Sequence, residues 1–284
     1  MKRNHIDQLL GFGFLKFCIL FVIFILGVIL FDIVSKGAGV ISWEFLTAMP
    51  EDGMTKGGIF PAIVGTFFVT LITAILSIPL GMGCAIFLNE YAYDGMLTRL
   101  IRMSIRNLSG VPSIVYGLFG VVVFVQLLSF DTSILSAGLT LGLMTLPWTI
   151  TASEEALKSI PQSYRDGSLA LGASKWQAIR TNVLPYSIPG MLTGTILGLA
   201  RAAGETAPIL FTGAAFYLPF LPKSFSDQFM ALPYHLYVMS TQHHAIDKVR
   251  PLAYGTALVL ICLVFLMNLA AIILRYQLRK KRLE

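Results

Sequence analysis

Long, nearly uncharged apolar stretches alternate with polar segments along most of the chain. Each stretch approaches the roughly 20 apolar residues that a helix needs to cross a bilayer. Their apolar residues run on without the alternation that membrane barrel strands require. Because helices satisfy their own backbone hydrogen bonds inside lipid, we expect an all-α membrane protein. The six predicted spans lie in or near residues 14–34, 57–89, 107–130, 132–153, 187–218 and 251–274.

Composition agrees with this pattern, since 56% of the 284 residues are hydrophobic and only 13% are charged. A soluble domain carries about 25% charged residues, so lipid must be the solvent for much of this chain. The first apolar stretch is longer than the core of a signal peptide, and no small-residue cleavage site follows it. We therefore expect it to remain as the first transmembrane helix.

Basic residues are distributed unevenly among the segments that join the spans. Of the 21 Lys and Arg residues, 15 fall on the side that holds both termini. The positive-inside rule places that side in the cytoplasm. The formal net charge of +6 then reflects membrane topology, and we expect no nucleic-acid binding. Arg201 lies within a span. The other five basic residues fall on the opposite side: Lys36, Lys56, Lys223, Lys248 and Arg250.

The cytoplasmic segment at residues 154–186 is amphipathic and too long for a simple turn. Gly172 can adopt a positive φ angle and so allows a sharp break between two short helices. Leu184-Pro185 is expected to end the segment before the membrane. Spacing alone leaves two interpretations open: a surface helix hairpin, or an element that docks into a groove of a cytoplasmic partner.

Arg201 and Glu205 lie four residues apart in the fifth span, so on a continuous helix they share one face. An arginine at the bilayer centre costs about 2.5–3.5 kcal/mol on the insertion scale, which makes such a residue a functional candidate. A guanidinium can bond two oxygens of an anion, and Glu205 would hold it when no anion is present. The alternative is a neutralising pair that serves only helix packing.

The run DGSLALGASKWQAIRTNVLP resembles the Glu-Ala-Ala loop of bacterial ABC importer permeases. Gly172 takes the glycine position, and the Leu-Pro pair follows at the distance of that pattern. Two departures occur, because Asp166-Gly167-Ser168 stand where Glu-Ala-Ala is expected and Asn182 stands where Ile is expected. In that family the loop forms a coupling helix in a cleft of the ATP-hydrolysing subunit. The resemblance implies coupling residues Asp166, Gly167, Ser168, Gly172, Ala173, Trp176, Leu184 and Pro185.

Four further runs resemble the A-type permease subunits of bacterial high-affinity phosphate importers. They are the residues 200–208, ARAAGETAP, together with 57–66, 85–91 and 110–117, and the similarity covers about residues 57–215. The resemblance implies a type I importer permease fold in the inner membrane, with Arg201, Glu205 and Thr206 at the substrate path or gate. Residues 1–56 would supply the first helix and an extracytoplasmic loop. Residues 57–284 would form the transport domain, with its coupling loop at 154–186.

The same resemblance implies a set of partners: a second related permease, two ATPase subunits and an extracytoplasmic phosphate-binding protein, with phosphate as the substrate. This chain contains no G-x-x-x-x-G-K-[ST] phosphate loop, so ATP and Mg²⁺ are expected on the ATPase. We expect no cofactor, no metal and no enzyme activity in the chain itself.

Three alternatives remain open at the level of sequence. A permease for another oxyanion, such as sulfate or molybdate, would use the same basic residue. An integral membrane enzyme acting on a lipid phosphate is disfavoured because no nucleophile, base cluster or metal set accompanies Arg201 and Glu205. A non-transporting assembly or signalling subunit is disfavoured by the coupling loop.

Overall fold

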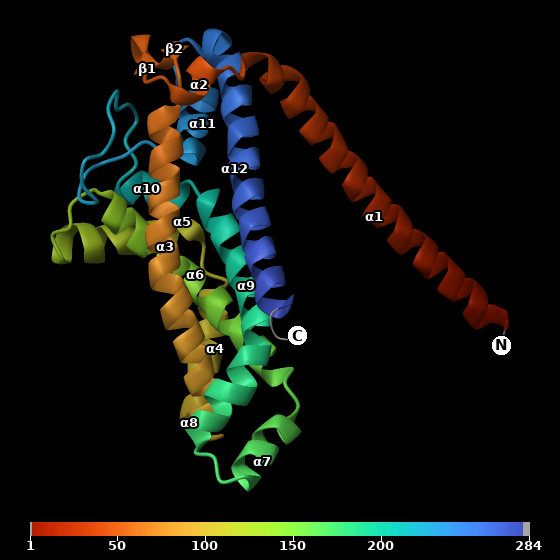
Figure 1. The fold of residues 1–284 in the computed structure, drawn as a ribbon. Helices are drawn as coiled ribbons and strands as arrows, with labels where there is room; N and C mark the ends of the chain where they lie inside the picture. Colours follow the sequence, from red (N-terminus) through yellow and green to blue (C-terminus); the bar gives the residue numbers. More distant parts are fainter. Residues whose placement is uncertain (1, 281–284) are drawn as a thin grey trace.

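The computed structural model describes residues 2–280, and long helices form the body of the molecule (Figure 1). The basic residues Lys281 and Arg282, which the sequence places on the cytoplasmic side, lie outside the described residues. The α-helices are α1 Lys2–Gly37, α2 Trp43–Thr47, α3 Phe60–Ile86, α4 Met96–Leu108, α5 Ser113–Gly120, α6 Ile134–Lys158, α7 Gln162–Ala170, α8 Lys175–Ala178, α9 Leu184–Ala203, α10 Ala207–Thr212, α11 Leu232–Thr241 and α12 Ile246–Lys280.

Shorter elements complete or interrupt these helices. Strands β1 and β2 form one small antiparallel hairpin. Three turns are π-helical, which means that an extra residue widens the helix locally. The bounds are β1 Pro50–Glu51, β2 Lys56–Gly57, 3-10 turns η1 Ala38–Val40 and η2 Asp52–Met54, and π turns η3 Phe87–Tyr91, η4 Val121–Leu127 and η5 Ile179–Val183.

Five helical runs within residues 2–280 are long and apolar enough to cross a membrane. They correspond to the first, second, fourth, fifth and sixth predicted spans. The predicted third span falls mainly on α5 and η4, whose axis is bent by 102° from that of α4. The five straight runs are Gly11–Val40, Phe60–Tyr91, Ile134–Lys158, Lys175–Ala203 and Ile246–Gln277.

The bend in the third span follows from Pro112, which immediately precedes α5. Proline lacks a backbone N–H and disfavours helical geometry in the residue before it, so α4 cannot continue into α5. The Tyr116 hydroxyl donates to the carbonyl oxygen of Leu108 at 2.9 Å and so holds the two helices at this corner. The predicted range 107–130 therefore begins in the last turn of α4 and continues, after the bend, as α5 and η4.

Helices α3, α6 and α9 pack together along the body. A Cβ added at Gly142 would lie 2.5 Å from Cδ2 of Leu76, and one at Gly138 would lie 2.6 Å from Cγ2 of Ile72. Small residues thus let the backbones approach closely, which is how helices associate in lipid. The Thr73 hydroxyl lies 2.8 Å from the Val69 oxygen and 3.2 Å from the Gly138 oxygen, so it also joins α3 to α6.

Helix α2, the β hairpin and α11 form one end of the body, opposite α7 and α8 (Figure 1). Helix α11 lies within residues 219–250, which join the last two predicted spans. It is packed inside the body, because Leu232, His235 and Val238 are buried. The backbone N–H of Leu232 donates to the Thr66 hydroxyl of α3 at 2.8 Å, which anchors the start of α11.

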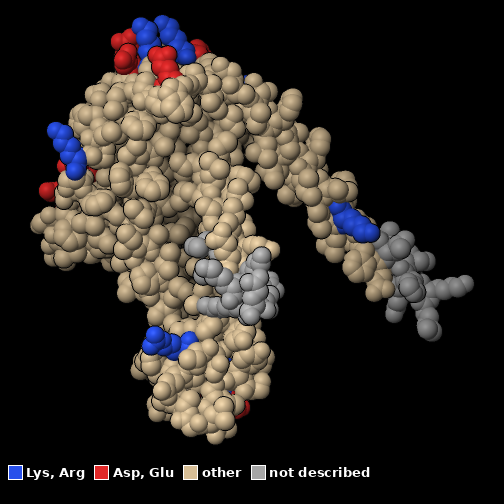
Figure 2. All heavy atoms as spheres, viewed as in Figure 1, with Lys and Arg blue, Asp and Glu red and all other residues tan. Residues whose placement is uncertain are grey.

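Helix α1 diverges from the body, to which its C-terminal end is attached (Figure 1). There the Lys36 amine donates to the Tyr254 hydroxyl of α12 at 3.3 Å. The apolar side chains of α1 are exposed in the single chain, and lipid or another apolar protein surface must cover them. On the face drawn in Figure 2, most charged side chains of the body lie near its two ends, with uncharged surface between them. This distribution is expected of a chain whose middle faces lipid and whose two ends face water.

We predict that Gly65→Ala destabilises the packing of α3 against the segment before α11. The added Cβ would clash with the carbonyl oxygen of Met230 and lie 2.8 Å from the Phe229 ring. Overpacking of this kind costs about 1–3 kcal/mol. The thermal unfolding temperature of the purified protein in detergent should therefore fall.

The matched control is Gly83→Ala in the same helix, where an added Cβ meets nothing within 4 Å. Alanine also has the higher helix propensity, so this variant should unfold at or above the parent temperature. Equal melting temperatures for the two variants would contradict the packing described here.

Candidate functional site

The cytoplasmic segment folds as a helix hairpin, α7 followed by α8, with its break at Gly172. This glycine has a φ angle of +82°, in the left-handed region, as the sequence predicts. Its N–H donates to the Leu169 oxygen at 3.0 Å, and the Ala173 N–H donates to the Ser168 oxygen at 3.2 Å. Ser174 then begins α8 with a capping box that also uses Gln177. The turn is therefore closed by backbone bonds on one side and a helix cap on the other.

The three residues at the Glu-Ala-Ala position lie in α7 and differ in their surroundings. Asp166 is exposed and accepts a hydrogen bond from the Gln162 amide at 3.2 Å. Gly167 has open space around it. Ser168 is buried and accepts a hydrogen bond from the Asn182 amide of η5. Asn182, a departure from the family pattern, thus ties α7 to the helical run that leads into the membrane.

Apolar side chains are exposed at the tip of the hairpin. Leu171 is 90% exposed, Trp176 51% and Leu169 47%, while Ala173 is half-buried. Exposed apolar side chains on a short amphipathic helix are typical of a surface that inserts into a groove of another protein. This arrangement favours the docking interpretation over a solvated hairpin.

Leu184 and Pro185 do not end the segment, contrary to the sequence expectation. Helix α8, η5 and α9 form one run, Lys175–Ala203, with Leu184-Pro185 at the first turn of α9. A proline at this position needs no N–H partner, and the wider π turn before it makes room for its ring. The hairpin is therefore continuous with the fifth span.

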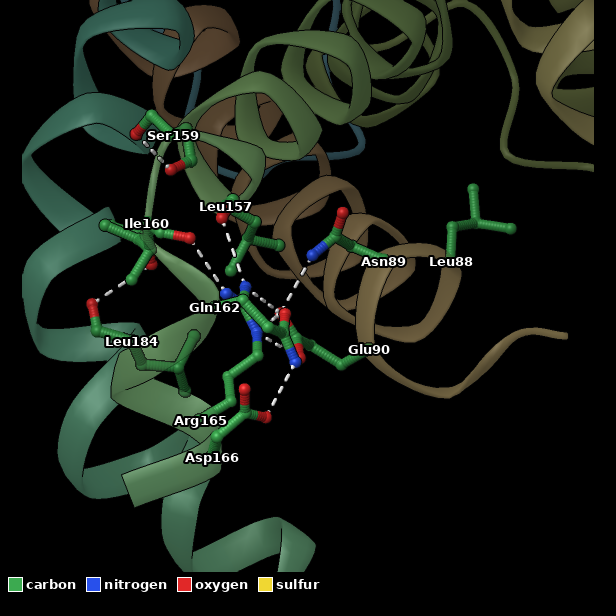
Figure 3. A network of polar contacts seen from close by, with 12 residues as sticks. Leu88, Asn89, Glu90, Leu157, Ser159, Ile160, Gln162, Arg165, Asp166 and Leu184 are labelled. Carbon is green, nitrogen blue, oxygen red and sulfur yellow. Dashed lines mark hydrogen bonds and ion pairs between the residues drawn. The ribbon is translucent and has the colours of Figure 1, made fainter. Parts of the chain in front are cut away.

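A buried ion pair joins the hairpin to the cytoplasmic end of α3 (Figure 3). Nη2 of Arg165 in α7 lies 2.6 Å from Oε1 of Glu90 in η3, and its Nε lies 3.1 Å from Oε2. The two side chains are only 13% and 5% exposed. Nη1 and Nη2 also donate to the carbonyl oxygens of Ile160 and Leu157, at 2.9 Å and 3.2 Å. One guanidinium thus connects α3, the end of α6 and α7.

A second ion pair lies close by. Nε of Arg102 in α4 lies 3.0 Å from Oε1 of Glu154 in α6, and Nη2 donates to the Leu88 oxygen at 2.7 Å. The sequence gave no role to either pair, because their members are 75 and 52 positions apart. A lone carboxylate at the end of an apolar span, such as Glu90, was the one signal available.

Beside the first pair lies a cavity of about 600 Å³. Glu90 of η3 and Arg165 of α7 both face it, and so do Lys158 and Lys175. Side chains therefore do not fill the space between η3 and the hairpin.

Arg201 and Glu205 lie together, but not on one helix. Helix α9 ends at Ala203, and Glu205 stands in the break before α10. The expectation of a shared helix face is wrong in this detail, because Pro208 near the start of α10 prevents a continuous helix. Nε of Arg201 still lies 3.2 Å from Oε1 of Glu205. Thr206 directly precedes the first turn of α10.

Trp148 of α6 is a third member of this cluster, which the sequence analysis did not identify. The guanidinium carbon of Arg201 lies 5.4 Å from the centre of its ring, a cation–π arrangement. The Arg201 side chain is 51% exposed and that of Glu205 17%. A charged group so exposed on a membrane chain must face water or a partner subunit, because lipid would penalise it. The Arg201 guanidinium, in contact with Glu205 and Trp148, is thus exposed on the surface of this single chain.

Residues 77–283 match the family described as binding-protein-dependent transport system inner membrane component. The chain is 33% identical over 282 residues to a probable ABC transporter permease protein, YqgI, of Bacillus subtilis, covering 95% of each. It is 35% identical over 226 residues to the phosphate transport system permease protein PstA 1 of Mycobacterium tuberculosis, covering 80% of this chain and 73% of that one.

Solved structures share the fold at low sequence identity. The chain matches a bacterial ABC transporter involved in the import of alginate with a TM-score of 0.66 and 15% identity, over 95% of this chain and 96% of that one. It matches the inward-facing MetNI methionine ABC transporter with a TM-score of 0.59 and 17% identity, over 78% and 94%. The helix arrangement is thus that of an ABC importer permease.

We predict that Gly172→Ala loosens the hairpin, because an alanine in the left-handed region costs about 1–2 kcal/mol. Local opening should become roughly 5- to 30-fold more frequent. Amide hydrogen exchange at Ala173, whose N–H closes the turn, should rise by this factor.

The control is Gly167→Ala, five residues earlier in α7, where an added Cβ meets nothing within 4 Å. Alanine favours the helix there, so exchange should stay unchanged or slow down. Unchanged exchange in both variants would show that Gly172 is dispensable for the turn.

Proposed function

The chain belongs to the binding-protein-dependent transport system inner membrane component family, and on that premise we propose that it carries phosphate through the bacterial inner membrane as one permease subunit of an ATP-driven importer. It is a multi-pass transport component and not an enzyme. Similarity to permeases named for phosphate transport, over most of this chain, supports phosphate as the substrate.

The observation that carries the proposal is the guanidinium of Arg201 at the break between α9 and α10. Glu205 accepts from Nε in the described structure, so the terminal nitrogens can donate to two oxygens of one anion. Trp148 supports the face of the guanidinium and limits its rotation. A planar donor held in this way suits an oxyanion better than a flexible ammonium does.

We further propose four partner chains around this subunit. A second related permease would complete the translocation path and face Arg201. Two ATPase subunits would supply ATP hydrolysis, and one would bind the exposed tip of the α7–α8 hairpin at Leu171 and Trp176. An extracytoplasmic phosphate-binding protein would dock at the end that holds α2 and the β hairpin.

The transport cycle that fits this arrangement is alternating access. ATP binding closes the ATPase pair and displaces the hairpin docked on it. Because α8 continues through η5 into α9, the displacement reaches Arg201 at the far end of the same run. There the binding of an anion to the terminal nitrogens of Arg201, with Glu205 on Nε, would open or close the path. Phosphate is the favoured anion, with Thr206 beside the break as a further polar group.

We predict that Arg201→Gln lowers phosphate uptake roughly tenfold or more, because hydrogen bonds to charged groups contribute about 1.5–3 kcal/mol. The measurement is uptake of labelled phosphate, sulfate and molybdate by proteoliposomes that hold this chain with its cognate partners. The parent should take up phosphate, and the variant should assemble normally.

Arg99→Gln is the matched control, since it removes an equal charge from the exposed, cytoplasmic face of α4. It should transport like the parent. Uptake of sulfate or molybdate in place of phosphate would overturn the substrate but keep the importer. Normal phosphate uptake by Arg201→Gln would reduce the Arg201–Glu205 pair to a packing element.

A further inference from the structure

The ion pair of Glu90 and Arg165 joins two parts of the chain that move differently in a coupled transporter. Glu90 lies in η3, at the cytoplasmic end of the second span, and Arg165 lies in the docking hairpin. Both side chains are almost fully buried, and they approach to 2.6 Å. A buried charge is costly to leave unpaired. Glu90 and Arg165 therefore stay in contact as long as the hairpin is packed against η3.

Arg165 donates through all three of its guanidinium nitrogens in this network. Its Nε and Nη2 donate to Glu90, while Nη1 and Nη2 donate to the carbonyl oxygens of Ile160 and Leu157. Those two carbonyls belong to the end of α6 and the turn that follows it. A displacement of Arg165 therefore pulls on α6 and on α3 at the same time (Figure 3).

Two arginines from different helices contact the π turn η3. Arg165 holds the side chain of Glu90, and Arg102 of α4 holds the Leu88 carbonyl at 2.7 Å while pairing with Glu154 of α6. π turns are irregular points within helices and occur frequently at functional sites. The end of α3 is thus tied to the hairpin by one arginine and to α4 and α6 by the other.

The cavity of about 600 Å³ beside the pair leaves clearance for movement of the hairpin. Of the charged groups that face it, Arg165 pairs with Glu90, and Lys158 pairs with Glu155 at 3.2 Å. Side chains do not fill the space between η3 and the hairpin, so a displacement of the hairpin reaches η3 only through the contacts that bridge this space. The Glu90–Arg165 contact crosses that gap.

We propose that Glu90 and Arg165 form a positioning pair that transmits displacement of the α7–α8 hairpin to the second span. The continuous run Lys175–Ala203 carries the displacement into the fifth span, and the pair carries it into α3. This inference rests on the proposed function, in which an ATPase subunit docks on the hairpin. A purely structural pair would stabilise the fold without setting how much transport each ATP supports.

The experiment uses the full complex of this chain with its partner subunits in proteoliposomes. Three quantities are measured for each preparation: assembled complex by size exclusion, ATP hydrolysis stimulated by the loaded binding protein, and substrate taken up per ATP. Glu90→Gln and Arg165→Gln should each lower uptake per ATP about tenfold while hydrolysis continues. The double variant should be no worse than either single variant, because the two residues act as a unit.

Arg106→Gln is the control, since it removes an exposed charge from the same end of the molecule. It should keep the parent ratio of uptake to ATP. Should the glutamine variants fail to assemble, Glu90→Asp and Arg165→Lys keep both charges and lengthen or weaken the contact. They should still lower uptake per ATP several-fold.

An unchanged ratio in assembled variants, or additive losses in the double variant, would overturn the proposal. A parent complex that transports another oxyanion would contradict only the substrate assignment, and the same ratio could be measured with that ion. A parent chain that does not bind the ATPase would contradict the proposed function itself. The two failures are therefore distinguishable.

Discussion

The close approach of α3, α6 and α9 is the constraint on which the rest of this structure depends. In lipid there is no water to drive apolar helices together, so their association relies on tight contact and on hydrogen bonds between them. Gly138 and Gly142 of α6 meet Ile72 and Leu76 of α3, and the Thr73 hydroxyl bonds across the same interface. This three-helix body fixes where the ends of the helices lie, and Glu90 and Arg201 stand near such ends.

Irregular backbone accompanies both ion-pair clusters. The π turn η3 presents Glu90, the π turn η5 precedes Pro185, and the break after α9 presents Glu205. Backbone that departs from a regular helix is tolerated at membrane depth only where it is packed in protein or lines a watery path. The breaks thus mark where this chain departs from simple spanning helices, and the two ion-pair clusters coincide with them.

The Glu90–Arg165 pair and the Arg201–Glu205 pair lie near opposite ends of the helical run Lys175–Ala203. Arg165 and Glu90 join the hairpin to α3 while almost fully buried, and each of the three Arg165 nitrogens has an acceptor. Arg201 is half exposed and keeps donors for another group. A buried pair with many contacts suits the transmission of force, whereas an open guanidinium suits contact with a mobile anion. The helical run Lys175–Ala203 connects the two regions.

The sequence by itself determined the all-α membrane fold, the location of its spans, their orientation and the hairpin break at Gly172. These follow from local causes: apolar length, charge asymmetry and the freedom of glycine at positive φ. Only the tertiary structure decided that Glu205 lies beyond the end of α9. It alone joined Glu90 to Arg165, and Trp148 to Arg201, because these pairs are distant in sequence and meet only once α3, α6 and α9 are packed.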